Sequence, residues 1–104
     1  MARKISYKKA DAEFAKLIKD RDKWTCQRCK TPHQVKSRGL HAAHIFSRRF
    51  KATRHDPENG VALCFACHML FHSRPLEFHE WVEERLGSER YEALKAKAKR
   101  LKLK

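Results

Sequence analysis

The stretch Asn59-Gly60-Val61-Ala62-Leu63-Cys64-Phe65-Ala66-Cys67-His68 decides the fold of this 104-residue chain. Asn59-Gly60 is a strong turn signal, and Val61 to Leu63 has the apolar composition of a short buried strand. Phe65 to Ser73 then predicts a helix, which Pro75 stops. A strand that runs directly into a helix indicates an α+β domain.

Two further apolar patterns place elements before this stretch. Leu40 to Phe46 has room for a short strand, which would pair with Val61 to Leu63 in a hairpin with a long, polar and basic loop. Residues 7–22 predict an amphipathic helix with its lysines outward, because apolar side chains recur there at helical spacing. The residues of its apolar pattern are Ala10, Phe14, Leu17 and Ile18.

The C-terminal part of the chain predicts two more helices. One spans residues 76–86, where Pro75 can open the helix and Gly87 can end it. The other spans residues 89–100, with Ser88 as its N-cap. We expect one domain over residues 1–104, with a core over about 24–74, an N-terminal helix over about 7–22, C-terminal helices over about 75–100, and a basic tail over 95–104 that frays.

The chain is strongly basic, since 25 Lys and Arg residues against 12 Asp and Glu residues leave a formal charge of +13. That surplus points to a polyanionic partner. No apolar run approaches the roughly 18 residues of a membrane-spanning helix, and the N-terminal stretch has no apolar run typical of a signal peptide. We therefore expect a cytoplasmic protein with no membrane partner, in which thiols stay reduced.

Four cysteines form two C-x-x-C knuckles, Cys26–Cys29 and Cys64–Cys67. Four soft thiolates favour Zn²⁺ in a closed structural site, which would add folding energy to a small core. Four unrelated core cysteines, or a redox dithiol, fit this spacing less well, because no βαβ pattern surrounds either pair. The insert between the knuckles is longer than in simple zinc ribbons, so we expect it to house something else.

A set of imidazole and amide side chains lies in and just after this insert: His41, His44, Asn59, His68 and His72. His68 and His72 are i and i+4 on the predicted helix and therefore share a face. On the predicted strand, His41 and Ala43 project to one face and His44 to the other. Imidazole near neutral pH can accept a proton or bind a divalent metal, the two capacities that water activation needs. The remaining histidines have no partner at a useful spacing and are interpreted as ordinary residues: His33, His55 and His79.

The run Ala43-His44-Ile45, then Asn59, then Leu63-Cys64-Phe65-Ala66-Cys67-His68 resembles the His-Asn-His signature of HNH endonucleases. The knuckles resemble those of the zinc-bearing branch of that family. More loosely, residues 41–54 resemble phage NinG-type recombination nucleases, and a phage-encoded protein would act in the host cytoplasm. The resemblance implies a small zinc-stapled ββα-metal domain, here with flanking N- and C-terminal helices.

The resemblance also implies a role for each matched residue. His44 would be the general base that deprotonates the attacking water. Asn59 would hold the hairpin loop and orient His44 through a backbone carbonyl. His68, the third member of the catalytic set, and His72 would bind a single catalytic divalent cation. The products would carry a 5′ phosphate and a 3′ hydroxyl.

One position departs from the family's pattern. The residue before the general base is usually a metal-binding Asp or His, and here it is Ala43, whose methyl group binds no metal. We expect His41, two residues earlier on the same strand face, to supply the missing ligand. A site built from neutral imidazoles favours Mn²⁺, Ni²⁺, Co²⁺ or Zn²⁺ over Mg²⁺, which prefers oxygen ligands.

Basic side chains crowd the loop between the two halves of the motif: Arg48, Arg49, Lys51 and Arg54. Because guanidinium groups bind phosphate oxygens well, we interpret these residues as substrate-positioning rather than only as a solvated face. The expected function is metal-dependent endonucleolytic nicking of DNA. Two alternatives stay open: a noncatalytic zinc-bound nucleic-acid binding module, which Ala43 favours, and a nuclease directed at RNA or branched structures.

Overall fold

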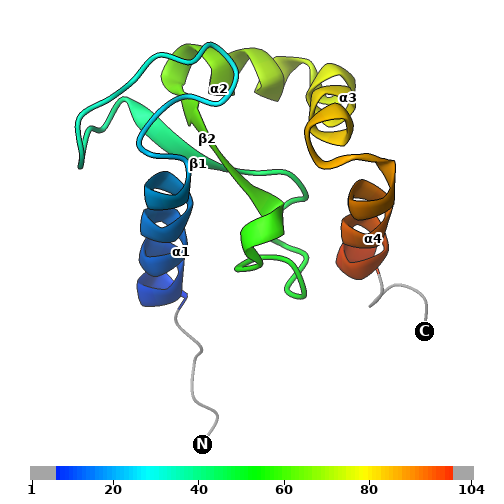
Figure 1. The fold of residues 1–104 in the computed structure, drawn as a ribbon. Coiled ribbons are helices and arrows are strands. Elements are labelled where there is room, and N and C mark those ends of the chain that lie inside the picture. Colours follow the sequence, from blue (N-terminus) through cyan, green and yellow to red (C-terminus); the bar gives the residue numbers. More distant parts are fainter. Residues whose placement is uncertain (1–6, 100–104) are drawn as a thin grey trace, which may run out of the picture.

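A two-stranded antiparallel hairpin lies at the centre of the molecule, with helices around it (Figure 1). The structure, a computed structural model, describes residues 7–99. Its elements in chain order are α1 (Lys8–Arg21), β1 (Leu40–His44), a 3₁₀ helix (Pro57–Asn59), β2 (Gly60–Cys64), α2 (Phe65–Ser73), α3 (Pro75–Leu86) and α4 (Ser88–Lys99). The α+β class and the element order expected from the sequence are confirmed.

The pairing register places different functional groups at the two ends of the hairpin. Leu40 of β1 lies opposite Cys64, and His44 lies opposite Gly60. The thiol of Cys64 is therefore at the end where α2 begins, whereas His44 is at the end where the long loop leaves β1. One short hairpin thus carries a sulfur ligand at one end and an imidazole at the other.

The outer edge of β2 is covered by the segment that follows α1. Gln27 N–H donates to the carbonyl of Ala62, and Ala62 N–H donates to the carboxylate of Asp22, each over 2.9 Å. Asp22 is buried and also accepts from Arg21 and Arg85. These bonds satisfy strand groups that would otherwise be exposed at a sheet edge, and they fix α1 against the hairpin.

Helix α1 packs on the start of β2 through two buried side chains, Phe14 and Ile18. Gly60 makes this close approach possible, since a Cβ there would lie 2.7 Å from both Phe14 Cζ and Ile18 Cγ1. Leu17, expected in the apolar pattern, is instead 49% exposed. The buried face of α1 is therefore narrower than the sequence pattern indicated.

Helices α3 and α4 meet at Gly87, whose φ of 89° suits glycine. The prediction that Ser88 is an N-cap is wrong, because Ser88 is the first helical residue and Tyr91 N–H donates to the carbonyl of Gly87. The Ser88 hydroxyl donates instead to the carboxylate of Glu83. The first half of the expected frayed tail, residues 95–99, is helical, and residues 100–104 lie outside the described residues.

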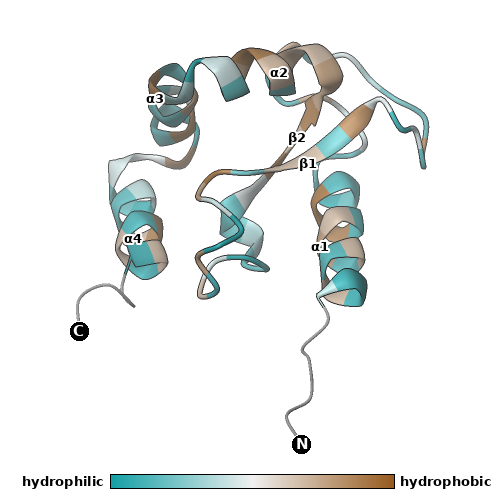
Figure 2. Ribbon diagram, turned by 180° about the vertical axis from the view of Figure 1, so that it is seen from behind, coloured by the Kyte–Doolittle hydropathy of each residue, from teal (hydrophilic) through white to brown (hydrophobic). Residues whose placement is uncertain are grey.

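The loop between the strands lies between α1 and α4, as both views show (Figures 1 and 2). On the α4 side, Arg90 pairs with Glu58 and Lys97 pairs with Asp56. Figure 2 shows hydrophobic colour along the strands and α2, where much of the core lies. Large core side chains come from all the helices and both strands: Phe14, Ile18, Leu40, Val61, Leu63, Phe71, Phe78, Val82, Tyr91 and Leu94. Within residues 7–99, no helix has the length and apolar character to cross a bilayer.

Candidate zinc centre and active site

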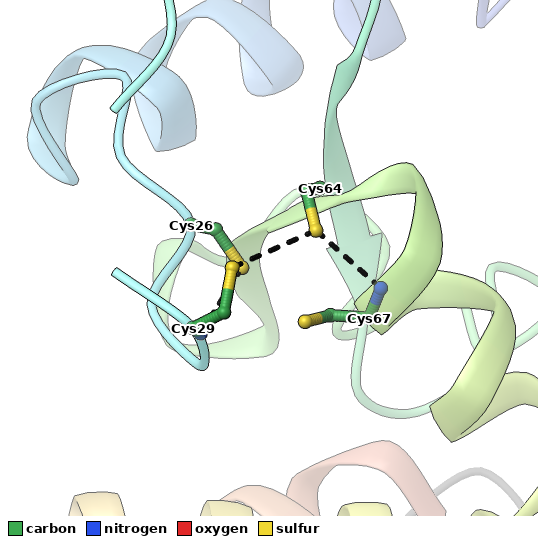
Figure 3. Close-up of side chains that lie close together, drawn as sticks. All are labelled: Cys26, Cys29, Cys64 and Cys67. Atoms are coloured by element: carbon green, nitrogen blue, oxygen red, sulfur yellow. Dashed lines mark hydrogen bonds between the residues drawn. The ribbon is translucent and has the colours of Figure 1, made fainter. Parts of the chain in front are cut away.

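The four thiols come together at the junction of β2 and α2, although one knuckle lies far from the other in the sequence (Figure 3). All four Sγ atoms lie within 4.8 Å of one another, and those of Cys29 and Cys64 are 3.8 Å apart. Zn–S bonds of about 2.3 Å in a tetrahedron place sulfurs roughly 3.8 Å apart. The four cysteines are unbridged, so this cluster fits a structural Zn²⁺.

Backbone N–H groups support the thiols in the way a zinc knuckle requires. Cys29 N–H donates to Sγ of Cys26, and Cys67 N–H donates to Sγ of Cys64, which also caps α2. Arg28 donates to Sγ of Cys67 over 3.4 Å. These donors would offset part of the negative charge that four thiolates bring to one ion.

The two knuckles place their thiols in different surroundings. A Thr31 hydroxyl, 3.1 Å from Sγ, lowers the pKa of the exposed Cys29 thiol to about 6. Burial raises the pKa of the Cys67 thiol to about 12. A thiolate at the buried position therefore needs a cation beside it, which is the chemistry that Zn²⁺ supplies.

A separate cavity of about 770 Å³ opens between the hairpin, α1 and α2. Its walls include His44 at the end of β1 and His68 and His72 on α2. The imidazoles of the hairpin and the helix thus border a common space, and a volume of this size accommodates a phosphate and its neighbours. Ala42, not His41, lines the cavity from β1 beside His44.

Two contacts fix the ring of His44. Its Nε2 lies 2.9 Å from the carbonyl oxygen of Arg54, and Phe14 of α1 stacks on the ring at 4.8 Å between centroids. A carbonyl only accepts, so Nε2 carries the proton and Nδ1 is left as the acceptor of a neutral ring. Burial lowers the pKa of His44 below its usual value, which favours this neutral form.

Asn59 is fully buried and ties the loop through its side chain. Its Nδ2 donates to the carbonyls of Phe46 and Thr53, each over 3.0 Å, and its Oδ1 accepts from Phe46 N–H. Thr53 immediately precedes Arg54, whose carbonyl holds His44. Asn59 therefore ties down the loop that carries this carbonyl.

His41 and His68 lie in direct contact, with their Nδ1 atoms 2.8 Å apart. This is the separation of a hydrogen bond between the rings; two imidazoles on one tetrahedral ion, each about 2.0–2.1 Å from it, would place their nitrogens roughly 3.3 Å apart, so the pair would have to open by about 0.5 Å to hold a divalent cation. His72 lines the same cavity but is not gathered with them. Among residues 7–99, only the cysteines form a group of three or more ligand side chains close enough to hold an ion.

The basic residues of the loop separate into different roles. Arg48 lines the cavity, whereas Arg49 lies over the ring of Phe50, 5.3 Å from its centroid, and Lys51 is exposed. Arg54 does not face the cavity as a free cation, because its guanidinium binds both oxygens of Asp11 and lies over Tyr7. Of the four, Arg48 is the best placed to meet a phosphate in the cavity.

Three residues at this site gave no signal in the sequence. Asp11 lines the cavity from α1 and binds His55 as well as Arg54. His79 of α3 lines the cavity too, with its Nδ1 2.9 Å from the hydroxyl of Tyr91. The expectation that His55 and His79 are ordinary residues misses these contacts, since nothing in their spacing links them to His44.

A hairpin that runs into a helix, with four clustered thiols at their junction and imidazoles on both parts, is the arrangement of a ββα-metal domain whose thiols could hold a metal such as zinc. The HNH endonuclease family model matches residues 26–79, and the chain belongs to this family. The matched region holds both knuckles and the His and Asn residues of the site, but neither α1 nor α4. No protein of curated function and no solved structure matches the chain, and nothing in the family match points to the phage NinG-type group.

Proposed function

We propose that this protein is a metal-dependent endonuclease that hydrolyses phosphodiester bonds in DNA, with His44 as the general base. The observation that carries the proposal is the orientation of His44. Its Nε2 is bound by the carbonyl of Arg54, so Nδ1 is free to accept a proton beside a cavity that also contains imidazoles of α2. A general base needs both this lone pair and a neutral resting form.

In the proposed reaction, Nδ1 of His44 removes a proton from a water molecule in the cavity. The water oxygen forms a bond to the phosphorus, and the bond from phosphorus to the 3′ oxygen breaks. The imidazolium that forms stays hydrogen-bonded through Nε2 to the carbonyl of Arg54, which stabilises its positive charge. The leaving 3′ oxygen takes up a proton from solvent water, so the products carry a 5′ phosphate and a 3′ hydroxyl.

His41 and His68 are the residues that would hold the divalent cation which the family implies, and His72 lies one turn further along α2 as a third candidate ligand that is not gathered with them. When bound, this ion would act as a Lewis acid on the scissile phosphate and the leaving oxygen. Burial lowers the pKa of His68, so its ring is neutral and able to coordinate near pH 7. Neutral imidazoles favour Mn²⁺, Ni²⁺, Co²⁺ or Zn²⁺ over Mg²⁺.

Arg48 and the surplus of basic residues would attract and position the nucleic acid. Arg48 lies on the wall of the cavity, where its guanidinium can contact a phosphate oxygen. Most of this attraction would be independent of base sequence and sensitive to salt. One active site cuts one strand per encounter, so a monomer would nick duplex DNA.

A noncatalytic zinc-bound binding module is the second candidate. It is favoured by Ala43, which is buried and offers no ligand, and by the separation of His72 from the His41–His68 pair. Such a module would bind DNA and leave it uncut. A nuclease acting on structured RNA or branched DNA would use the same residues and differ only in substrate.

Relaxation of supercoiled plasmid with Mn²⁺ tests the proposal. The zinc-loaded protein should nick the plasmid, EDTA should stop it, and His44→Ala should lower the rate by about 10²- to 10⁴-fold, the usual contribution of a general base. His33→Ala is the matched control, because His33 lies on the knuckle loop with its ring bonded to Thr31. Binding of plasmid without cleavage by both wild type and His44→Ala would favour the binding module.

The pH profile of nicking gives an independent measure of the base. His44 must be neutral to act, and its pKa is lowered by burial. The rate should therefore fall only as the pH drops below about 6.5, the unperturbed value for histidine. An acid limb centred well above that pH would contradict His44 as the base. Structured RNA and branched DNA offered in the same assay would identify the preferred substrate.

A further inference from the structure

Helix α1, which lies outside the family-matched residues, binds the loop beside the active site through the carboxylate of Asp11. Asp11 accepts from Nε and Nη2 of Arg54 over 3.0 and 2.7 Å, and His55 Nε2 lies 2.7 Å from the same carboxylate. The side chains of two consecutive loop residues are thus held by a single group on α1. Arg54 and His55 directly follow Thr53, whose carbonyl accepts a hydrogen bond from the Asn59 side chain.

The backbone of Arg54 contacts His44, the proposed general base. The carbonyl oxygen of Arg54 is the atom 2.9 Å from Nε2 of His44, while its guanidinium is the group bound by Asp11. Stacking on Tyr7, 4.3 Å from the ring centroid, further limits this side chain. Asp11 therefore holds the guanidinium of Arg54, while the backbone carbonyl of the same residue holds the ring of His44.

We propose that Asp11 is a positioning residue for His44, acting through Arg54. By holding the side chain of Arg54, it keeps the Arg54 carbonyl where it fixes the proton of His44 on Nε2 and leaves Nδ1 as the acceptor. As far as catalysis is concerned, this inference rests on the proposed function. The state of the His44 ring is a property of the free protein and can be measured whether or not the protein cuts DNA.

Charged groups from three elements face His44 and must be considered together. Asp11 from α1 favours its protonated form, whereas Arg48 and Arg54 from the loop disfavour it. His68 from α2 also interacts with it electrostatically. Asp11 itself is held ionised, because the Arg54 guanidinium keeps the pKa of this carboxyl well below its usual range. Replacing Asp11 with a neutral residue leaves the two cations unopposed, so the pKa of His44 should fall.

Nitrogen-15 NMR of the imidazoles in the zinc-loaded full chain tests the positioning role directly. The wild type should show His44 protonated on Nε2, and Asp11→Asn should shift part of the population to the Nδ1 tautomer and lower the pKa of His44. Asp11→Glu, which keeps a carboxylate within reach of Arg54, should restore both. Asp20→Asn is the matched control, because Asp20 lies on the same helix and its carboxylate binds Lys16 and Trp24 instead of Arg54.

Nicking kinetics supply the second readout. Asp11→Asn should lower kcat by about tenfold, a part of what a general base contributes, with little change in KM for DNA. The acid limb of its pH profile should move to lower pH, which a loss of folded protein alone would not cause. If Asp11→Asn fails to fold, Arg54→Lys replaces it, since Lys keeps the charge but loses the two-pronged bond.

Distinct outcomes separate the two proposals. An unchanged tautomer and pKa of His44 in folded Asp11→Asn or Arg54→Lys would overturn the positioning role, whatever the nicking activity. A wild type that never nicks, but whose His44 responds to Asp11→Asn as described, would keep the positioning role and refute the proposed function.

Discussion

The thiol cluster and the imidazole cavity share β2 and α2, yet they are assembled by different means. Each pair of thiols is set by a short knuckle in which the backbone N–H of the second cysteine donates to the sulfur of the first. The imidazoles come from β1 and α2 and depend on α1 and the long loop for their orientation. The thiols are therefore gathered from two local turns that meet, whereas the orientation of His44 depends on packing between distant segments.

Removing one thiol should have the largest effect, because it tests whether the closed site stabilises the fold. Structural zinc contributes apparent binding free energies of roughly 10–16 kcal/mol, as large as the total stability of a small domain. Cys67→Ser should therefore lose zinc and unfold most of the chain at 25 °C, as measured by circular dichroism and metal content. His72→Ala, on the same helix, should keep both. A folded Cys67→Ser with the wild-type Tm would show that the thiol site does not stabilise the fold.

The fold was predictable wherever the signal was local. The helix over Phe65–Ser73 follows from the turn before it and the proline after it, and the two knuckles follow from spacing alone. The resemblance to HNH endonucleases also singled out Asn59, whose amide binds the loop, while its part in a reaction stays a prediction. Each of these depends on residues close in the chain or on a motif whose members act as a set.

The contacts that orient the His44 ring were not predictable, because they join segments far apart in the chain. Asp11 and Phe14 sit on a helix whose periodicity indicates only an amphipathic face, and they reach His44 by packing. Arg54 shows the same limit, since a cation in a basic loop gives no sign that a carboxylate on α1 already binds it. Charge patterning predicted a polyanionic partner but could not tell which cations of the loop are already paired within the protein.

Asn59→Ala should have the next largest effect. It tests whether the loop beside the imidazole cavity can unfold locally while the thiol cluster keeps its zinc. Three hydrogen bonds of a fully buried amide are lost, so the free energy of unfolding should fall by about 2–4 kcal/mol. Urea unfolding measures this loss. Trypsin should cut the native variant within residues 46–54 while it still retains zinc. If the native variant instead lost zinc before any cleavage, the thiol cluster and the loop would be shown to unfold together.

His41→Ala tests whether the imidazole site, like the thiol site, binds a metal ion. If His41 replaces the ligand missing at Ala43, its loss should weaken binding of Mn²⁺ to the zinc-loaded protein by tenfold or more, about 1.4 kcal/mol. Titration calorimetry measures the affinity, and the plasmid assay should show a parallel fall in nicking. Thermal stability should change little, because the ring is only partly buried. Unchanged affinity and unchanged nicking would eliminate His41 as a ligand.

Lys30→Gly should have the smallest effect and addresses how the thiol site is built. Lys30 follows Cys29 and adopts a left-handed conformation, with φ of 65° and its N–H donating to the carbonyl of Cys26. A side chain in this conformation costs about 1 kcal/mol that glycine avoids. Lys30→Ala is the matched control, since it removes the same charge and keeps the strain. In urea unfolding, Lys30→Gly should be more stable than Lys30→Ala by about 0.5–1 kcal/mol, and equal stabilities would mean that the knuckle turn is unstrained.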